Sequence, residues 1–380
     1  MTRQAVARPP GRIQIGRVVG VPVYLTPSWF LFAAFIVVTS APPLVDRVGT
    51  VSAYIAATSF AVLLLVSVLL HEVGHCLVAR AFDLPVRSIT VTLLAGLTEI
   101  TEPPQTPARE YAVAVSGPMV SLLLAGIGVA SVPLFEGLPQ LICEGIAITN
   151  GIVAAFNLLP GLPLDGGFLV DSLVWRLTGS RESGLIAAGW CGRVVTVLVV
   201  LGLVGRPILN GQPPDLFILV WALFIGAFLW VGATNAIRSG RGGRLLAGIR
   251  IDSVWRRAAS LSARASAAQA LDLRVSGPGG TAVVVEDDLG NPIGLLDDDS
   301  LRAIPEQSRA SVSVTSVMLR QPDGWVVEAT PDQSIATVVG AMQRLGIGAV
   351  PVRGPNGRID GIVLATDLEA ALSRGSAQRT

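Results

Sequence analysis

The chain has 380 residues, of which 51% are hydrophobic and only 14% are charged, and its net charge is +1. Soluble domains carry about 25% charged residues, so this composition, with a mean hydropathy of +0.62, excludes an ordinary soluble protein. The near-zero net charge gives no reason to expect a nucleic-acid partner.

Six apolar segments are long enough to cross a bilayer, whose hydrocarbon core takes about 20 residues of helix. They are residues 28–44, 54–82, 111–134, 141–160, 184–205 and 215–237. A further apolar stretch, 168–177, follows a break rich in proline and glycine after the fourth segment. We therefore expect residues 1–240 to form an all-α polytopic membrane domain with six transmembrane helices.

Arginines near the segment ends predict the orientation of the chain in the membrane. They are frequent at the amino terminus, in the connections between segments two and three and between four and five, and after the sixth segment. The other connections hold Arg47 and Arg206. Positive charge marks cytoplasmic loops, so six crossings place both termini in the cytoplasm. Arg193 falls inside the fifth segment, where its role stays open.

Residues 241–380 have the composition of a soluble domain and contain two copies of one α/β unit. The second copy has a predicted helix at 334–345, strands at 349–352 and 360–364, and a closing helix at 368–372. The first copy, 251–303, has the matching strands at 281–286 and 292–296. The glycines and arginines of 238–243 predict a hinge between the membrane domain and this pair.

His71, Glu72 and His75 form the pattern His-Glu-Val-Gly-His within the second apolar segment. Residues four apart share one face of a helix, so both imidazoles can bind one metal ion. Glu72 lies beside them, where its carboxylate can accept a proton from water that the metal activates. The alternative is a pair of structural histidines, but ionisable residues at membrane depth are costly and usually functional.

A catalytic zinc ion usually takes three protein ligands and keeps a fourth position open. Since the chain has only two histidines, the third ligand has to come from a carboxylate near the membrane: Glu99, Glu102, Glu110, Glu144, Asp165 or Asp171. Asp165 is favoured because it ends the sequence Asn-Leu-Leu-Pro-Gly-Leu-Pro-Leu-Asp, which breaks the helix. Broken backbone at membrane depth is buried in protein or lines a cavity. By the predicted topology, His71, His75 and Asp165 can converge near the cytoplasmic side.

These two motifs on two membrane helices resemble those of the site-2 protease family of intramembrane metalloproteases. The resemblance covers about residues 12–240. It implies one zinc ion per chain with His71, His75 and Asp165 as ligands, and Glu72 as the catalytic base. It also implies that Asn157 positions the substrate or stabilises the oxyanion.

The resemblance further implies the substrate class and the location. Family members cleave transmembrane segments of membrane-anchored regulatory proteins, often anti-sigma factors in bacteria, so we expect an enzyme of the bacterial inner membrane. Residues 93–100 can act as an edge strand that pairs with an extended peptide. Two features depart from the family pattern: Ala95-Gly96 stands where many members have Gly-Gly, and no connection between helices is long enough for a PDZ domain.

The second α/β copy resembles a CBS module (cystathionine-β-synthase type), as in the branch of the family with a carboxy-terminal CBS pair. Such pairs often bind adenosine nucleotides through a Thr or Ser three residues before an Asp. Asp367 matches, but Leu364 replaces the hydroxyl, and Asp297 and Ser300 of the first copy do not fit. We expect residues 241–380 to form a cytoplasmic domain that regulates the enzyme or dimerises it, with weak nucleotide binding or none.

A protein of another class stays open as an alternative. A catalytically silent membrane scaffold, or a transporter whose acidic and histidine side chains form an ion path, would also place ionisable residues in the membrane. The intact His-Glu-x-x-His pattern with an Asp at a helix break favours the enzyme, because every chemically required group is present.

Overall fold

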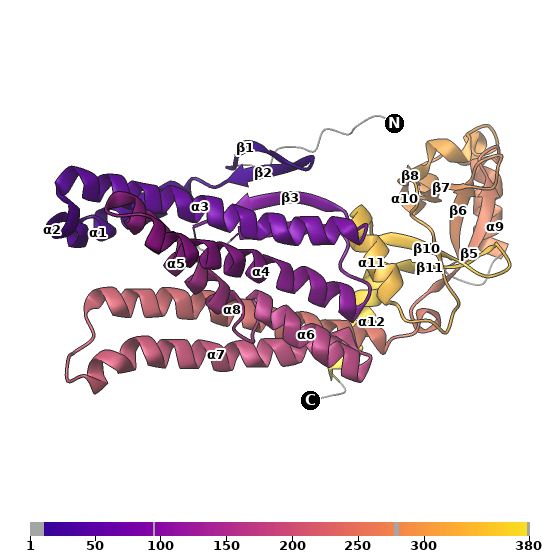
Figure 1. Cartoon of the computed structure of the whole chain (residues 1–380). Coiled ribbons are helices and arrows are strands. Elements are labelled where there is room, and N and C mark those ends of the chain that lie inside the picture. Colours follow the sequence, from indigo (N-terminus) through magenta and orange to yellow (C-terminus); the bar gives the residue numbers. More distant parts are fainter. Residues whose placement is uncertain (1–10, 94–95, 277–280, 378–380) are drawn as a thin grey trace. The chain divides into compact units, whose positions relative to one another are not determined.

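The structure is a computed structural model, and it describes residues 11–93, 96–276 and 281–377. The chain divides into two units, Met1–Arg241 and Gly242–Thr380 (Figure 1). Long helices and one small sheet make up the first unit. The second unit has a larger sheet with short helices.

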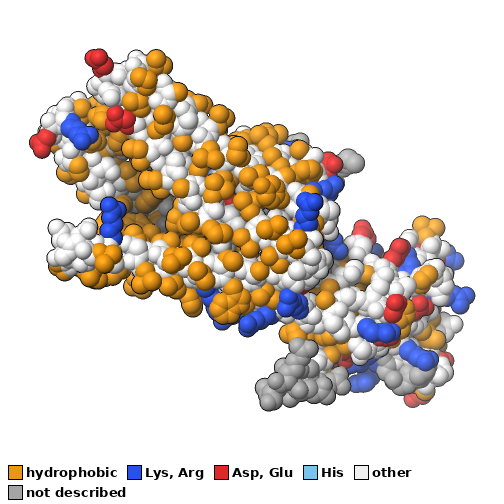
Figure 2. Space-filling model, turned by 60° about the horizontal axis from the view of Figure 1, so that its bottom comes forward, with side chains coloured by type: hydrophobic (Ala, Val, Ile, Leu, Met, Phe, Trp, Pro, Cys, Tyr) orange, Lys and Arg blue, Asp and Glu red, His pale blue; other side chains and the backbone are white. Residues whose placement is uncertain are grey.

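Six helices in the described part of the chain are long and apolar enough to cross a membrane. They are Ser28–Val48, Thr50–Ala81, Pro107–Leu134, Leu138–Asn157, Arg181–Leu209 and Leu216–Ala247. Each overlaps one of the six predicted segments, so the predicted set of membrane helices is confirmed. Their surfaces are strongly apolar, as Figure 2 shows for one face of this unit, where charged side chains are sparse.

The first span is interrupted, the third ends in a short turn, and the other four are single helices. The elements are α1 (Ser28–Ser40), η1 (Pro42–Leu44), α2 (Val45–Val48), α3 (Thr50–Ala81), α4 (Pro107–Ser131), η2 (Val132–Leu134), α5 (Leu138–Asn157), α7 (Arg181–Leu209) and α8 (Leu216–Ala247). The apolar stretch 168–177 lies in α6 (Asp165–Thr178), which at 14 residues is too short to cross a bilayer.

The predicted hinge at 238–243 is wrong as local structure, because α8 continues through it to Ala247. Glycine in a helix interior costs only about 1 kcal/mol relative to alanine. A helix already formed over more than twenty apolar residues propagates through three glycines, since each added residue closes a further hydrogen bond.

Residues 158–164, the break between α5 and α6, are held by packing rather than by helical hydrogen bonds. The amide of Leu162 donates to the carbonyl of Ala188 in α7 at 3.2 Å. The side chains of Leu162 and Leu164 are buried. Satisfied backbone and buried leucines are what broken backbone requires at membrane depth. The break therefore fixes where α6 begins, and so also the position of Asp165, its first residue.

A four-stranded sheet accompanies the membrane helices, and only its last strand was expected from the sequence. Its strands are β1 (Ile13–Val18), β2 (Val21–Leu25), β3 (Val86–Val91) and β4 (Gly96–Ile100), in that order. β2 and β3 are parallel, and β3 and β4 are antiparallel with Ile89 opposite Thr98. Val21, Val23 and Ile89 form a buried cluster with Cys76 of α3. The sheet thus lies on α3, and β4 is its edge strand within the described residues.

The second unit contains one seven-stranded sheet in the order β8-β7-β6-β5-β11-β10-β9. Its strands are β5 (Arg256–Ser262), β6 (Ala282–Glu286), β7 (Pro292–Leu296), β8 (Met318–Arg320), β9 (Val327–Glu328), β10 (Ala349–Arg353) and β11 (Ile359–Leu364). The helices are α9 (Ala267–Ser276), α10 (Asp298–Arg302), α11 (Ala336–Leu345) and α12 (Ala365–Ala377), with short turns η3 (Ile251–Ser253), η4 (Glu306–Ser308) and η5 (Val314–Ser316).

The strand pairing of this unit repeats. β5 is parallel to β6, which is antiparallel to β7, and β9 is parallel to β10, which is antiparallel to β11. Each half has its own hydrophobic core, one around Val283 and Val285 and one around Val350 and Val352. The two predicted copies of one α/β unit are therefore present, joined where β5 pairs with β11.

Candidate metal centre

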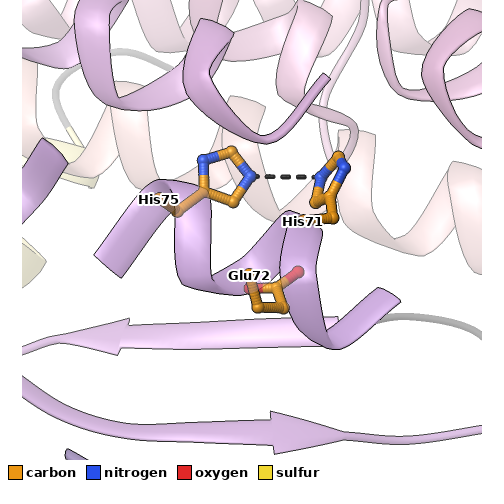
Figure 3. Close-up of side chains that lie close together, drawn as sticks. All are labelled: His71, Glu72 and His75. Atoms are coloured by element: carbon orange, nitrogen blue, oxygen red, sulfur yellow. Dashed lines mark hydrogen bonds between the residues drawn. The ribbon is translucent and has the colours of Figure 1, made fainter. Parts of the chain in front are cut away.

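His71, Glu72 and His75 lie on α3, where the helix is covered by α4 on one side and by the small sheet on another. All three side chains are buried. Figure 3 shows the two imidazoles on one side of α3 and the Glu72 carboxylate on the side that faces the strands. Nε2 of His71 and Nε2 of His75 are 3.2 Å apart. This follows from the helical period, which places side chains four residues apart over one another.

Asp165 completes the cluster of potential ligands, because it is the first residue of α6. Its Oδ2 lies 2.9 Å from Nε2 of His71, and its Oδ1 lies 3.4 Å from Nε2 of His75. Zinc bonds of about 2.0–2.1 Å place tetrahedral ligand atoms about 3.3 Å apart. The two nitrogens lie 3.2 Å apart, and each lies 2.9 or 3.4 Å from a different oxygen of Asp165. These separations are close to those between ligand atoms of a zinc tetrahedron, so the residues present fit the ion.

The second nitrogen of each imidazole has a partner that fixes the ring. Nδ1 of His75 lies 2.7 Å from the carbonyl oxygen of Val113, and Nδ1 of His71 lies 2.9 Å from Oγ of Ser121. A carbonyl oxygen only accepts hydrogen bonds, so Nδ1 of a neutral His75 carries the proton and Nε2 keeps its lone pair for a metal. Ser121 is fully buried on α4 and was not predicted from the sequence.

Gly117 of α4 leaves room for this cluster. A Cβ atom at position 117 would overlap Nε2 of both His71 and His75. No other amino acid fits there without moving the imidazoles. The sequence contains Ser116-Gly117-Pro118 in the middle of an apolar helix, and small residues at such positions allow close helix contact.

Glu72 is held by β4 rather than by a neighbouring cation. Oγ1 of Thr98 donates a hydrogen bond to Oε2 of Glu72 at 2.7 Å and lies 3.1 Å from the Glu72 carbonyl oxygen. A Cβ atom at Gly96 would overlap the Glu72 carboxylate, so the strand passes directly over it. Glu72, His71 and His75 offer ligand atoms within 4.8 Å of one another. The carboxylate is thus adjacent to the donor cluster, with its orientation set by Thr98.

A cavity of about 330 Å³ opens beside the cluster. It lies between β4, the start of α4, α6 and the start of α7. Its lining includes Glu72, His75, Gly96, Leu97, Thr98, Ile100, Glu110, Val113, Pro163, Asp165, Phe168 and Arg181. The edge strand therefore faces the same space as Glu72, His75 and Asp165.

Comparisons with known proteins agree with this geometry. The family model described as peptidase family M50 matches residues 59–143, and the CBS domain model matches residues 314–374. A Synechocystis protein with the provisional name zinc metalloprotease sll0528 is 29% identical over 96% of each chain. Rip3 of Mycobacterium tuberculosis, also provisionally named a zinc metalloprotease, is 30% identical over 84% of this chain and 83% of its own.

The chain belongs to peptidase family M50.

The predicted resemblance to site-2 proteases is therefore confirmed, and the chain is an M50 zinc metalloprotease of the membrane with a carboxy-terminal CBS domain. Among solved structures, the site-2 protease of Methanocaldococcus jannaschii is similar, with a TM-score of 0.42 and 20% identity over 60% of this chain and 95% of that one.

Of the other carboxylates considered as a third ligand of this M50 protein, three have hydrogen-bond or ion-pair partners elsewhere. Glu99 accepts from Ser88 at 3.1 Å, Glu110 pairs with Arg181 at 3.0 Å, and Glu144 accepts from Gln140 at 3.2 Å. Glu102 is exposed. Asp171 is fully buried and forms no hydrogen bond to the described residues through its carboxylate.

Asn157 is the last residue of α5 and is half-buried, but it is not among the described residues that line the cavity. Its role in positioning substrate stays a prediction. Ala95, of the Ala95-Gly96 pair that departs from the family pattern, lies outside the described residues. Gly96 begins β4 and lies against Glu72, as the expected edge strand requires.

Proposed function

We propose that this zinc metalloprotease hydrolyses peptide bonds in or near transmembrane segments of membrane-anchored regulatory proteins. In this proposal His71, His75 and Asp165 hold one zinc ion, and Glu72 is the general base. The observation that carries it is the meeting of two imidazole nitrogens and the Asp165 carboxylate, with separations of 2.9 to 3.4 Å, beside the Glu72 carboxylate and a cavity inside a bundle of membrane helices.

A bound zinc ion would polarise the scissile carbonyl and lower the pKa of water at the site. The protein's own groups supply the remaining chemistry. Glu72 accepts the proton of the attacking water and returns it to the leaving amine. Thr98 keeps the Glu72 carboxylate aimed at this position through its hydrogen bond. Ser121 and the Val113 carbonyl hold the imidazoles against rotation.

The substrate has to be presented as extended chain, because a helix hides its amides within its own hydrogen bonds. β4 supports this step. It pairs with β3 along one edge, its other edge has no strand partner among the described residues, and Gly96, Leu97 and Thr98 line the cavity. We infer that a peptide adds to β4 as a further strand, with main-chain hydrogen bonds giving affinity for many sequences. Asn157 is proposed to position the substrate or to stabilise the oxyanion.

The arginine distribution supports the proposed location, and membership of family M50 supports the proposed substrates. Arginine-rich ends on one side of the spans support cytoplasmic termini in a bacterial inner membrane. Single-span regulatory proteins, anti-sigma factors among them, are the proposed substrates. The carboxy-terminal CBS pair is proposed to regulate or dimerise the enzyme rather than to take part in hydrolysis. Its described residues contain neither His nor Cys that could bind a metal.

The test compares wild-type protein with Glu72→Gln, both reconstituted in vesicles with a tagged single-span test substrate. Gln is nearly isosteric with Glu and cannot act as a base, so cleavage should fall by about 10²–10⁴-fold while zinc is retained. Near-normal cleavage by the variant would remove Glu72 from the mechanism. If the enzyme cleaved a soluble unfolded protein as fast as the single-span substrate, the proposed preference for membrane segments would be wrong.

A further inference from the structure

Arg193 of α7 lies between two tryptophan rings on the outer surface of the helical bundle. Its guanidinium carbon is 4.7 Å from the ring centre of Trp190 on the same helix and 4.9 Å from that of Trp230 on α8. Contact with two indole faces holds a guanidinium by cation–π attraction. Side chains of two helices therefore hold the guanidinium in place, unlike that of a free surface arginine.

This arginine has no anionic partner in the described part of the chain. Its Nη2 donates to Oγ1 of Thr234 at 3.3 Å, and its Nε has no acceptor. Arg181, on the same helix, differs in this respect because it forms an ion pair with Glu110 at 3.0 Å. Ionisable groups inside a membrane are usually paired with one another, since an isolated charge in hydrocarbon is costly. The charge of Arg193 is thus uncompensated within the described residues.

The surface around Arg193 is open. Trp190 and Trp230 are 48% and 45% exposed, and Val194 and Val231 beside them are more exposed still. Other positions of α7, among them Ala188, Gly189 and Gly192, are buried. The arginine and its two tryptophans therefore lie on a face that meets lipid or the helix of another protein.

The depth of Arg193 in the membrane distinguishes contact with a lipid headgroup from contact with the helix of another protein. Arg193 lies 12 residues after the start of α7 and 16 before its end, which corresponds to about 18 Å and 24 Å along the axis. A hydrocarbon core is about 30 Å thick, so a helix of 29 residues exceeds it and places Arg193 near the middle. Snorkelling to lipid headgroups is available to arginines near helix ends. The two indoles also hold Arg193 in place at this depth.

We propose that Arg193, Trp190 and Trp230 form a docking site for a transmembrane helix of another protein that carries Asp or Glu near its middle. A carboxylate at that depth neutralises the guanidinium. The ion pair stabilises both charged groups, because neither can be hydrated there. The exposed indoles and valines supply apolar contact around the ion pair. The site lies outside the candidate metal centre, so it recruits a partner whether or not that partner is cleaved.

The experiment uses the full chain with Glu72→Gln, labelled with a donor dye in phosphatidylcholine vesicles. The probe is a synthetic Leu-Ala transmembrane peptide that carries an acceptor dye and one central Glu, with matched peptides bearing Gln or Leu instead. Polar contacts between membrane helices strengthen association modestly, so energy transfer should show about fivefold tighter binding of the Glu peptide. Arg193→Gln should remove this preference, whereas Arg206→Gln, on the same helix near its end, should keep it.

The outcomes are distinct. Equal binding of the Glu and Leu peptides to the chain with its native Arg193 would overturn the proposal without any need for a folded arginine variant. A Glu preference that persists in Arg193→Gln would also overturn it. Loss of the preference in vesicles rich in phosphatidylglycerol would assign the site to a lipid headgroup. Arg193-dependent transfer only between two labelled copies of the chain would assign it to self-association, and either assignment would replace the proposed partner.

Discussion

Thr98 of β4 donates its hydroxyl to Oε2 of Glu72 at 2.7 Å, which links the edge strand of the small sheet to the proposed base. The two residues are 26 positions apart and belong to different elements. A peptide that paired with β4 would therefore lie beside the carboxylate that acts on it. In the proposed mechanism, one strand therefore both binds the substrate and orients the base.

Replacing Thr98 by Val should reduce kcat without loss of zinc. The change removes the hydrogen bond to a carboxylate, worth about 1.5–3 kcal/mol, so kcat should fall by roughly tenfold to a hundredfold. Thr98→Ser keeps the hydroxyl and should retain most activity. The measurement is single-substrate kinetics in vesicles together with zinc content. Full activity of the Val variant would show that Thr98 does not orient Glu72.

Asp165→Ala should lower the zinc content of the purified protein, because one oxygen of Asp165 lies 2.9 Å from Nε2 of His71 and the other lies 3.4 Å from Nε2 of His75. Glu99→Ala is the matched control, since Glu99 is bonded to Ser88 and should leave zinc unchanged. Elemental analysis of both variants gives the answer. Wild-type zinc in Asp165→Ala with loss in Glu99→Ala would move the third ligand to β4.

Gly117→Ala should also abolish stoichiometric zinc, although it removes no ligand. The added methyl group would occupy the space of the two Nε2 atoms and force His71 and His75 apart. Gly126→Ala on the same helix meets nothing within 4 Å and should bind zinc normally. Zinc content and thermal unfolding of both variants separate loss of the site from loss of the fold. Normal zinc in Gly117→Ala would mean that α4 can shift away from α3 at little cost.

ATP and AMP should bind weakly or not at all to the second unit. Asp367, which matches the Asp of the nucleotide-binding pattern, accepts two hydrogen bonds of 2.6 Å from Arg256. The hydrogen bonds from Arg256 to Asp367 raise the pKa of that guanidinium, so Arg256 stays charged. Calorimetric titration of the full chain with ATP and AMP tests this. The Arg256→Ala variant should bind these nucleotides more tightly, because the change frees the carboxylate of Asp367. Micromolar binding by the wild type would show that neither Arg256 nor Leu364 obstructs the cleft.

Removing the second unit should leave the metal centre intact. The cut belongs after Ala247, where α8 ends, rather than at the predicted hinge, which is helical. The truncated protein should keep its zinc and change only in its rate of cleavage or in its oligomeric state. Complete loss of zinc on truncation would contradict the separation of roles between the two units.

The sequence by itself determined what depends on local periodicity. Runs of apolar residues defined the six spans, and the four-residue spacing of His71 and His75 placed both imidazoles on one helix face, because a helix repeats every 3.6 residues. The strands of the second unit were also predictable, since β7 (Pro292–Leu296) coincides with its predicted range and β10 and β11 differ by one residue.

Only the tertiary structure decided which distant groups meet. The sequence favoured Asp165 among six carboxylates for the third ligand. The structure shows that Asp165, 94 positions from His71, lies 2.9 Å from its Nε2, and the break before it is held by a hydrogen bond from Leu162 to Ala188 of α7. Ser121, Thr98 and Gly117 gained their roles in the same way, from the contacts of α4 and β4 with α3. No local pattern encodes such contacts, because helix packing and strand pairing join residues whose separation along the chain is unrelated to their distance in space.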